Sequence, residues 1–351
     1  MESTALFDGL GKILSPVGFT LDQEQPHMSG ERFLMMKDKF VLVGKDRDEK
    51  KVIIKMANKL GGQKEIEHEK KTRDLLNSVV FANDNILFPR ETFFGTEAGY
   101  MIWATEYINQ EKVFVEHDLE EQFFLILRAF EEQEAFHATT FEHLKSIDKF
   151  FPIFHAKAYF DEFKKFKEAV SKLNDSLLNE TLNKAESLLR SKEKNIEKYS
   201  KYLTHTDFVP HNFRVKGRTI YMLDLSAVHF GNKYEGWARF LNYMIIHNPE
   251  LERLLVKYVK ENRDREDYEN LHAMRIYKLG FLLHFYATSL TKTEGDLKEL
   301  TERRINFWHK IMKYMLEDKD IPQNLIEEYK GERDSLRSDE EKKRQREFAV
   351  A

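Results

Sequence analysis

The chain has 351 residues, of which 41% are apolar, and its formal net charge is −4. This composition is that of a globular protein with room for two lobes, and it argues against a disordered chain or a strongly basic nucleic-acid-binding protein. Because there is no cysteine, disulfides, thiolate metal sites and cysteine nucleophiles are excluded. The start resembles no signal peptide and no apolar run could span a bilayer, so we expect a cytoplasmic protein without membrane or nucleic-acid partners.

The first third of the chain is predicted to form strands. Residues 1–28 are expected to be a helical extension, and residues 29–108 an antiparallel sheet with one helix. Three strands are predicted over "ERFLMM", "KFVLVGKD" and "KKVIIKMAN", and two more over "ETFFGTEAGYMIWATEYI", around a Gly-containing turn. The charged segment "GGQKEIEHEKKTRDLLNSV" lies between these groups and is predicted to be helical.

Residues 109–328 are predicted to be mainly helical. In "DLEEQFFLILRAFEEQEAFHATTFEHL", Phe and Leu recur at three- and four-residue intervals, which indicates an amphipathic helix. Further helices are predicted over "YFDEFKKFKEAVSKL", "LNKAESLLRSKEKNIEKYSKYL", "EGWARFLNYMIIHN", "LERLLVKYVKEN", "LHAMRIYKLGFLLHFYATSL" and "LTERRINFWHKIMKYMLED". Residues 329–351 are highly charged and are expected to be a solvated helix or a disordered tail.

One tight hairpin interrupts these helices at "THTDFVPHNFRVKGRTIYMLDLS", residues 204–226. Its strands "FRV" and "TIYMLDL" flank a turn centred on Gly217. Asn212 enters the first strand and Asp224 leaves the second, so we expect them to lie side by side, with Asp207 on the incoming loop. Carboxylate and amide oxygens gathered in this way suit a hard cation such as Mg²⁺.

These residues match what phosphoryl transfer from ATP requires. The reaction needs a metal held against the phosphates, a cation that orients them and a group that accepts the hydroxyl proton. Asn212 and Asp224 can supply the first, and Asp207 the last. Lys55, at the end of a β-branched strand run, is the candidate for the cation.

A lysine with this role has to be held in place by a carboxylate. Glu65 and Glu69 are four residues apart on the predicted helix and therefore share a face. We favour Glu69 as the partner of Lys55, because the apolar pair Leu75 and Leu76 follows it and can seat the helix on the sheet. The choice between the two glutamates stays open.

Several motifs resemble the aminoglycoside phosphotransferase and choline kinase family. "HTDFVPHN" is similar to the family's H-G-D-x-x-x-x-N catalytic loop, with Thr206 in place of glycine. "YMLDLS" is similar to the strand with the metal-binding Asp, and "GNKYEGWARFL" to the segment after it, with Glu235 where Asp is common. "VIIK", "IWATEYI" and "EEQEAFHAT" resemble the lysine strand, the adenine hinge and the helix before the catalytic loop. The resemblance covers roughly residues 29–320.

The resemblance implies a two-lobed, protein-kinase-like α+β fold, with a small antiparallel-sheet N-lobe and a mainly helical C-lobe. It implies ATP and Mg²⁺ as cofactors and a small-molecule hydroxyl as acceptor. The implied site residues are Asp207 as catalytic base, Asn212 and Asp224 as metal ligands, Lys55 on the phosphates with Glu69 as its partner, Glu106, Tyr107 and Ile108 at the adenine, and His205 as a brace of the loop. The first-lobe segment "MMKDKF", which would cover the phosphates, contains no glycine, and no D-F-G triplet follows the metal-binding Asp224. Both features point away from protein kinases.

Several points stay open at this level. The acceptor could be an aminoglycoside, an amino alcohol or a sugar, and neither the choice between ATP and GTP nor the oligomeric state follows from the sequence. Tyr234, Glu235 and Trp237 could line an acceptor pocket, although the spacing of Trp237 and Phe240 is more typical of a helix core stripe. The alternative function is that of a nucleotide-binding regulator without turnover.

Overall fold

The structure is a computed structural model that describes residues 2–23, 39–79, 88–150 and 152–337. The chain divides into two compact units. The first contains Met1–Ser78, Ile86–Lys112 and Phe213–Ser226, and the second contains Val79–Asn85, Val113–Asn212 and Ala227–Ala351. The hairpin was expected in the C-lobe, but its contacts assign it to the first unit.

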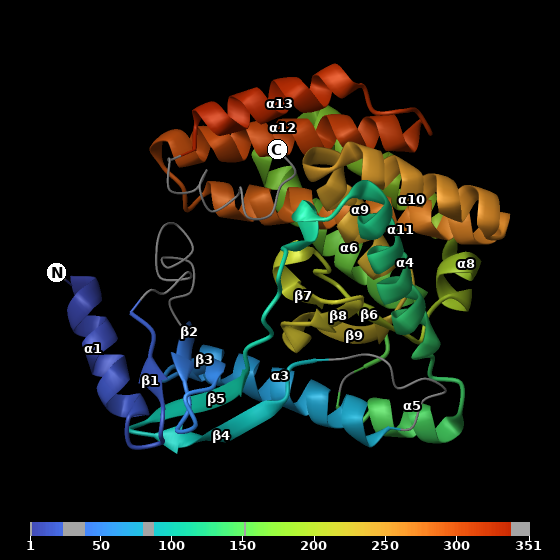
Figure 1. Ribbon diagram of the computed structural model, residues 1–351. Coiled ribbons are helices and arrows are strands. Elements are labelled where there is room, and N and C mark those ends of the chain that lie inside the picture. Colours follow the sequence, from blue (N-terminus) through green and yellow to red (C-terminus); the bar gives the residue numbers. More distant parts are fainter. Residues whose placement is uncertain (1, 24–38, 80–87, 151, 338–351) are drawn as a thin grey trace. The chain divides into compact units, whose positions relative to one another are not determined.

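The first unit contains a five-stranded antiparallel sheet with the strand order β1-β2-β3-β5-β4 (Figure 1). The strands are β1 (Thr20–Leu21), β2 (Phe40–Lys45), β3 (Lys51–Ala57), β4 (Glu91–Glu97) and β5 (Tyr100–Glu106). The last four confirm predicted strands, whereas "ERFLMM" lies outside the described residues. The sequence did not indicate β1, because two residues are too few to show a period.

Two helices pack against this sheet, α1 (Glu2–Leu14) and α3 (Leu60–Ser78). Side chains of α1 share one apolar core with alternate residues of the central strands; its buried members are Leu10, Leu14, Phe19, Leu42, Val52, Ile54, Met56, Ile102 and Ala104. Because neighbouring strand residues point to opposite faces, Lys55 lies on the face away from that core. On α3, Ile66 packs with Trp103 in a second cluster.

The predicted hairpin is confirmed as part of the first unit. Strand β7 (Phe213–Lys216) pairs antiparallel with β8 (Thr219–Met222), and Phe213 stands opposite Met222. Gly217 has a φ of 58°, the left-handed conformation that such a tight reversal requires and glycine adopts without strain.

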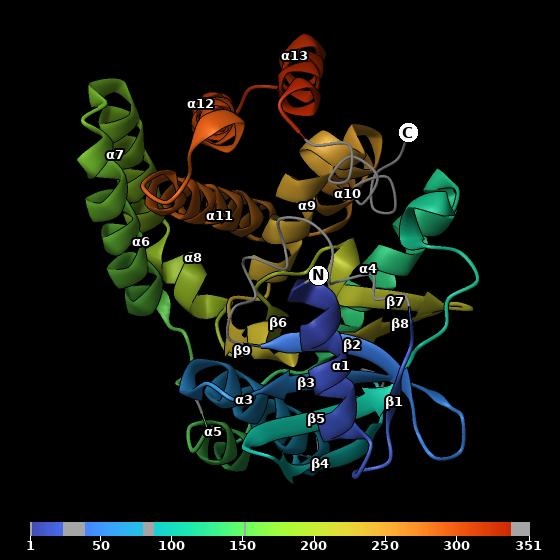
Figure 2. The ribbon, with the colours of Figure 1, turned by 90° about the vertical axis from the view of Figure 1, so that its left-hand side faces the viewer.

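The second unit is mainly helical (Figure 2). Its helices are α4 (Leu119–Ala135), α5 (Phe141–Ile147), α6 (Ala156–Val170), α7 (Ser176–Ser191), α8 (Glu193–Lys198), α9 (Glu235–His247), α10 (Pro249–Asn262), α11 (Arg265–Leu290), α12 (Gly295–Leu316) and α13 (Gln323–Ser335). The long helix α11 is buried over most of its circumference and packs against α6, α9 and α12. The two units together confirm the predicted α+β class, a small antiparallel sheet and a mostly helical second part.

The second unit also contains one small sheet that positions the catalytic-loop segment. Strand β6 (Tyr202–His205) pairs antiparallel with β9 (Val228–Gly231), and α4 and α9 pack against β6. Asp207 follows β6 by two residues. The loop therefore leaves a scaffold built from two strands and two helices.

The segment 118–144 forms two helices instead of the single helix predicted. Helix α4 ends at Ala135, and Phe136 and Ala138 make backbone hydrogen bonds with the β6 segment, Leu203 N to Phe136 O and Ala138 N to Lys201 O. Helix α5 then begins afresh, capped by the Thr140 hydroxyl. Backbone pairing with a distant segment thus interrupts the helix over residues 136–140, which no local pattern reveals.

Helix α13 includes the beginning of the charged C-terminal segment; the residues from 338 onwards lie outside the described part. None of the helices in the described ranges combines the length and the apolar character that a bilayer span needs.

Candidate functional site

Lys55 and Glu69 form a buried ion pair in the first unit. Lys55 Nζ donates to both carboxylate oxygens of Glu69 at 2.5 Å, and only 3% of the Glu69 side chain is exposed. Glu65 pairs with Lys39 instead. Glu69 is therefore the partner of Lys55, which answers the choice that the sequence left open. Burial disfavours the charged ammonium, but the carboxylates of Glu69 and Asp224 outweigh it and raise the pKa of Lys55.

Asp224 joins this pair after the end of β8. Its backbone is in the left-handed region, with a φ of 53°, which is uncommon for non-glycine residues but which aspartate adopts more readily than most. Leu225 N donates to Glu69 Oε1 at 3.2 Å, and Ser226 Oγ donates to Asp224 Oδ1 at 2.6 Å. The first unit therefore brings Lys55, Glu69 and Asp224 together, although Asp224 is more than 150 residues from the other two.

The segment expected to contact adenine follows β5. Glu106 N donates to Arg90 O at 2.9 Å, and Tyr107 N donates to Lys51 O at 3.1 Å, so both N–H groups are engaged in the sheet. Ile108 is buried. Contacts of this segment with a nucleotide base would have to come from other backbone groups than these two donors.

Asp207 in the second unit is held by two neighbours. Arg239 Nε, on α9, donates to Asp207 Oδ1 at 2.7 Å, and Asn212 Nδ2 donates to Asp207 Oδ2 at 2.9 Å. The side chain is still 47% exposed, so the carboxylate is open to an incoming molecule. Burial opposes ionisation, but the charge of the Arg239 guanidinium and its hydrogen bond outweigh it and lower the pKa of Asp207 to about 2.

Asn212 and His205 hold the loop around Asp207. Asn212 Nδ2 also donates to the backbone oxygen of Asp207 at 2.8 Å, so that both donors of the amide point at one residue. Asp207 N donates to His205 Nδ1 at 3.3 Å. Thr206, which replaces the glycine of the motif, donates its N–H to Ala227 O at 2.8 Å at the end of the β6–β9 pair. The backbone at Thr206 thus continues the β6–β9 hydrogen bonding, and the added side chain does not interrupt it.

Glu235 is a buried structural group. Only 3% of its side chain is exposed, and its carboxylate accepts hydrogen bonds from Lys278 Nζ at 2.9 Å, Tyr159 OH at 2.8 Å and His229 Nε2 at 2.8 Å. Burial disfavours the charge, but Lys278 and His229 outweigh it and hold the pKa of Glu235 well below its usual value. These contacts tie α9 to α6, β9 and α11, and so fix the helix that carries Arg239.

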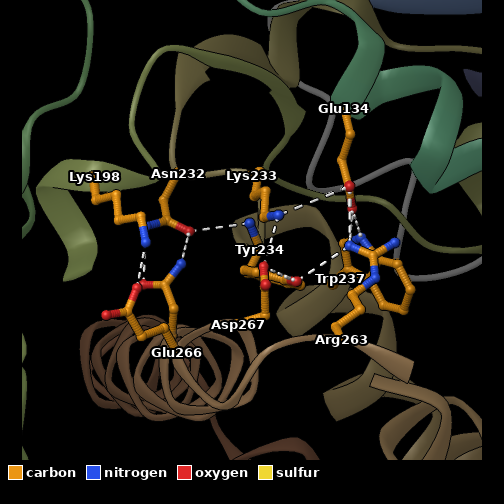
Figure 3. A network of polar contacts seen from close by, with 10 residues as sticks. Glu134, Lys198, Asn232, Lys233, Tyr234, Trp237, Arg263, Glu266 and Asp267 are labelled. Atoms are coloured by element: carbon orange, nitrogen blue, oxygen red, sulfur yellow. Dashed lines mark hydrogen bonds and ion pairs between the residues drawn. The ribbon is translucent and has the colours of Figure 1, made fainter. Parts of the chain in front are cut away.

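Tyr234 and Trp237 also have structural roles (Figure 3). Tyr234 OH donates to Asp267 Oδ1 at 2.6 Å, and Trp237 Nε1 donates to Glu134 Oε1 at 3.1 Å. Arg263 Nη1 donates to both Glu134 oxygens, at 2.7 and 2.9 Å. Both aromatic side chains are fully buried. The suggestion that these residues line an acceptor pocket receives no support from this geometry.

Arg239 is the functional candidate that the sequence reasoning missed. It lies 32 residues after Asp207, and nothing in "EGWARFL" distinguishes it from an ordinary exposed helix arginine. Its position two residues after the buried Trp237 and three after the buried Gly236 places it at the edge of the core face of α9, a weak signal.

Within the described ranges, no group of three or more histidine or acidic side chains is arranged to hold a metal ion.

Of the comparisons with known proteins, the one with solved structures finds matches. No protein-family model matches the chain, and no curated protein sequence is significantly similar to it. The GDP complex of wild-type aminoglycoside 2′-phosphotransferase-IIIa has a TM-score of 0.62 at 14% identity, over 87% of this chain and 98% of that one. ADP-bound aminoglycoside phosphotransferase APH(2″)-Ib has 0.55 at 12% identity, over 89% and 98%.

A macrolide 2′-phosphotransferase from Brachybacterium faecium has a TM-score of 0.56 at 10% identity, over 85% of this chain and 97% of that one. The chain therefore has the fold of aminoglycoside and macrolide phosphotransferases, as the sequence resemblance predicted. At these identities the likeness establishes the fold alone.

Proposed function

We propose that the protein is a kinase that transfers the γ-phosphoryl group of ATP to a hydroxyl of a small molecule, with magnesium as cofactor. The observation that carries this proposal is the group formed by Lys55, Glu69 and Asp224 in the first unit, on a fold whose solved members include ADP- and GDP-bound phosphotransferases. A buried lysine kept charged by two carboxylates is suited to orient phosphate oxygens.

The candidate site residues have distinct tasks in the proposed reaction. Lys55 binds the α- and β-phosphates, and Glu69 fixes its ammonium and, through Leu225 N, the chain next to Asp224. The segment Glu106–Ile108 contacts the adenine through its backbone. Since the acceptor hydroxyl loses its proton late in a loose transition state, a carboxylate with a pKa of about 2 can serve as the base.

The proposed metal ligands fit magnesium by their chemistry. Asn212 uses both amide donors on Asp207, so its Oδ1 would be the atom that holds a cation, and Asp224 would supply carboxylate oxygens. When bound, Mg²⁺ neutralises negative charge on the phosphates. Asp207 takes the acceptor proton at Oδ1 or Oδ2, the acceptor oxygen forms the new P–O bond, and ADP leaves. Arg239 keeps the carboxylate ionised and oriented.

Glu69→Gln and Glu65→Gln form a matched pair of tests four residues apart on α3. MgATP is expected to raise the Tm of the wild-type protein. Glu69→Gln should weaken MgATP binding about tenfold or more, because Lys55 loses the charge that holds it. Glu65→Gln should leave binding unchanged, since Glu65 pairs with Lys39 and not with Lys55.

Calorimetric titration with MgATP measures both variants. If wild-type protein shows neither a Tm shift nor heat of binding, the nucleotide-dependent function is excluded. Equal affinities of Glu69→Gln and Glu65→Gln would exclude the assigned role of the Lys55–Glu69 pair.

A further inference from the structure

The indole ring of Trp103 lies next to the ammonium of Lys55. These two residues stand directly opposite each other in the antiparallel pair of β3 and β5, so their side chains share one face of the sheet. Lys55 Nζ is 5.5 Å from the centre of the Trp103 ring, and only 3% of Trp103 is exposed. Because the face of an indole attracts a cation more strongly than other aromatic rings do, the ring adds to the attraction that Glu69 exerts on Lys55.

A β-bulge in β4 turns a carboxylate toward this ring. In a regular strand, residues two apart face the same side, and Glu91 would therefore face the core with Phe93. The register with β5 instead shifts between Glu91 and Phe93, so that Glu91 stands opposite Thr105, on the face of Trp103. Trp103 Nε1 donates to Glu91 Oε2 at 2.8 Å. Re-aiming one side chain beside an active site is a common use of a bulge.

Helix α3 holds the same carboxylate. Lys70 Nζ donates to Glu91 Oε1 at 3.4 Å and to Oε2 at 3.2 Å. Lys70 directly follows Glu69, the partner of Lys55. Contacts therefore run from Lys55 through Trp103 and Glu91 back to α3, and they connect this helix with β3, β4 and β5.

An aromatic ring beside the ammonium differs from a second carboxylate in one respect. An ammonium has three N–H donors, and both carboxylate oxygens of Glu69 already accept hydrogen bonds from Lys55. The face of the indole stabilises the charge electrostatically and offers no strong acceptor atom. The ring thus helps to keep Lys55 charged and in place, and leaves its remaining donor capacity to phosphate oxygens.

We propose that Trp103 and Glu91 are positioning residues of the nucleotide site. The indole face holds the Lys55 ammonium for the phosphates, and Glu91, fixed by Lys70, holds the indole. This inference rests on the proposed kinase function, because it takes Lys55 as the group that binds the α- and β-phosphates. Since both residues act through Lys55, their loss should weaken binding of MgATP and leave binding of adenosine, which has no phosphate, unchanged.

Titration of the full-length protein, followed by calorimetry for MgATP and by ligand-observed NMR for adenosine, separates this role from a structural one. Trp103→Leu is expected to weaken MgATP binding about tenfold and to bind adenosine as the wild type does. Trp308→Leu is the matched control, because Trp308 on α12 is equally buried, with 4% exposed. It should bind both ligands as the wild type does.

A second pair of variants tests the role of the bulge without removing a core side chain. Glu91→Leu, at a side chain that is 29% exposed, takes the acceptor from Trp103 Nε1 and should weaken MgATP binding about threefold or more, again without an effect on adenosine. Glu97→Leu makes the same change at the other end of β4 and should bind MgATP as the wild type does.

The indole N–H signal of Trp103 reports its contact with Lys55 in the absence of nucleotide. The chain has three tryptophans, and Trp103→Phe identifies this signal in a ¹H–¹⁵N spectrum. Lys55→Met is expected to move it, because the ammonium no longer acts on the ring. Lys51→Met, four residues earlier on β3 and next to the Tyr107 ring, should leave it in place.

The outcomes distinguish this inference from the proposed function. The positioning role is excluded if Trp103→Leu and Glu91→Leu bind MgATP as the wild type does, if they lose MgATP and adenosine alike, or if Lys55→Met leaves the indole signal unmoved. The kinase function stands in each of these cases, provided that the wild type binds MgATP. A wild type that binds no MgATP, with an indole signal that moves in Lys55→Met, would retain the contact of ring and ammonium and exclude the kinase.

Discussion

Asp207→Asn is expected to lower the rate of phosphoryl transfer by about 10²- to 10⁴-fold, the usual contribution of a positioned general base. Asparagine has the shape of aspartate and can still accept a hydrogen bond from Arg239, but it cannot take the proton of the acceptor hydroxyl. Because the pKa of Asp207 is about 2, the wild-type rate should not fall through protonation of this carboxylate between pH 5 and 8. Initial rates with γ-labelled ATP measure both effects.

The control for this variant is Asp161→Asn, which removes an exposed carboxylate that pairs with Lys157 on α6. It should transfer phosphate at the wild-type rate. Asp207→Asn should keep the MgATP-induced Tm shift, since no nucleotide contact is assigned to Asp207. A rate within a factor of two of the wild type would show that another group is the base.

Glu235→Gln is expected to destabilise the second unit by about 3–5 kcal/mol, the cost of removing one partner of a buried ion pair. Lys278, with 4% of its side chain exposed, would keep its charge without the carboxylate that now balances it. His229 and Tyr159 would lose their shared acceptor as well. Denaturant unfolding followed by circular dichroism measures the loss.

The pH dependence of this effect has a definite sign. The pKa of Glu235 is lowered below its ordinary value of 4.5 in the folded protein, so its stabilisation is fully present above that value. The stabilisation is lost as the pH falls through the lower, folded-state pKa. The difference in stability between wild type and Glu235→Gln should therefore be constant from pH 6 to 8 and shrink in acid.

Two further variants make this measurement decisive. Combining Glu235→Gln with Lys278→Met should cost less than the sum of the single changes, because the unpaired ammonium is gone. Glu180→Gln removes an exposed partner of Lys184 and should have little effect. If Glu235→Gln unfolds at the same denaturant concentration as Glu180→Gln, the carboxylate does not hold α9 in place.

The sequence was informative wherever a short-range period or motif decides the structure. The β-branched run "KVIIK" alternates between two faces, and this alternation places Lys55 opposite the core formed by Val52 and Ile54. The turn at Gly217 fixes the hairpin, and the four-residue spacing of Glu65 and Glu69 limits the partner of Lys55 to two candidates. The two-part α+β architecture followed from the same patterns.

Features that depend on contacts between distant segments could not be predicted in this way. Arg239 meets Asp207 only because α9 packs beside β6, and "EGWARFL" contains no sign of this contact. The break between α4 and α5 depends on backbone pairing with the segment that leads into β6. Tyr234 and Trp237 proved to be core side chains because a network of polar contacts through Glu134 and Asp267 satisfies their polar atoms.

The most direct test of the kinase function is transfer of label from γ-labelled ATP to pooled hydroxyl compounds by the wild-type protein. We expect a labelled small molecule that forms only with protein and magnesium, and that disappears in Asp224→Asn. If the protein binds MgATP tightly but labels no compound in pools of sugars, amino alcohols, aminoglycosides, sugar phosphates and hydroxy acids, it is a nucleotide-binding regulator and not a kinase.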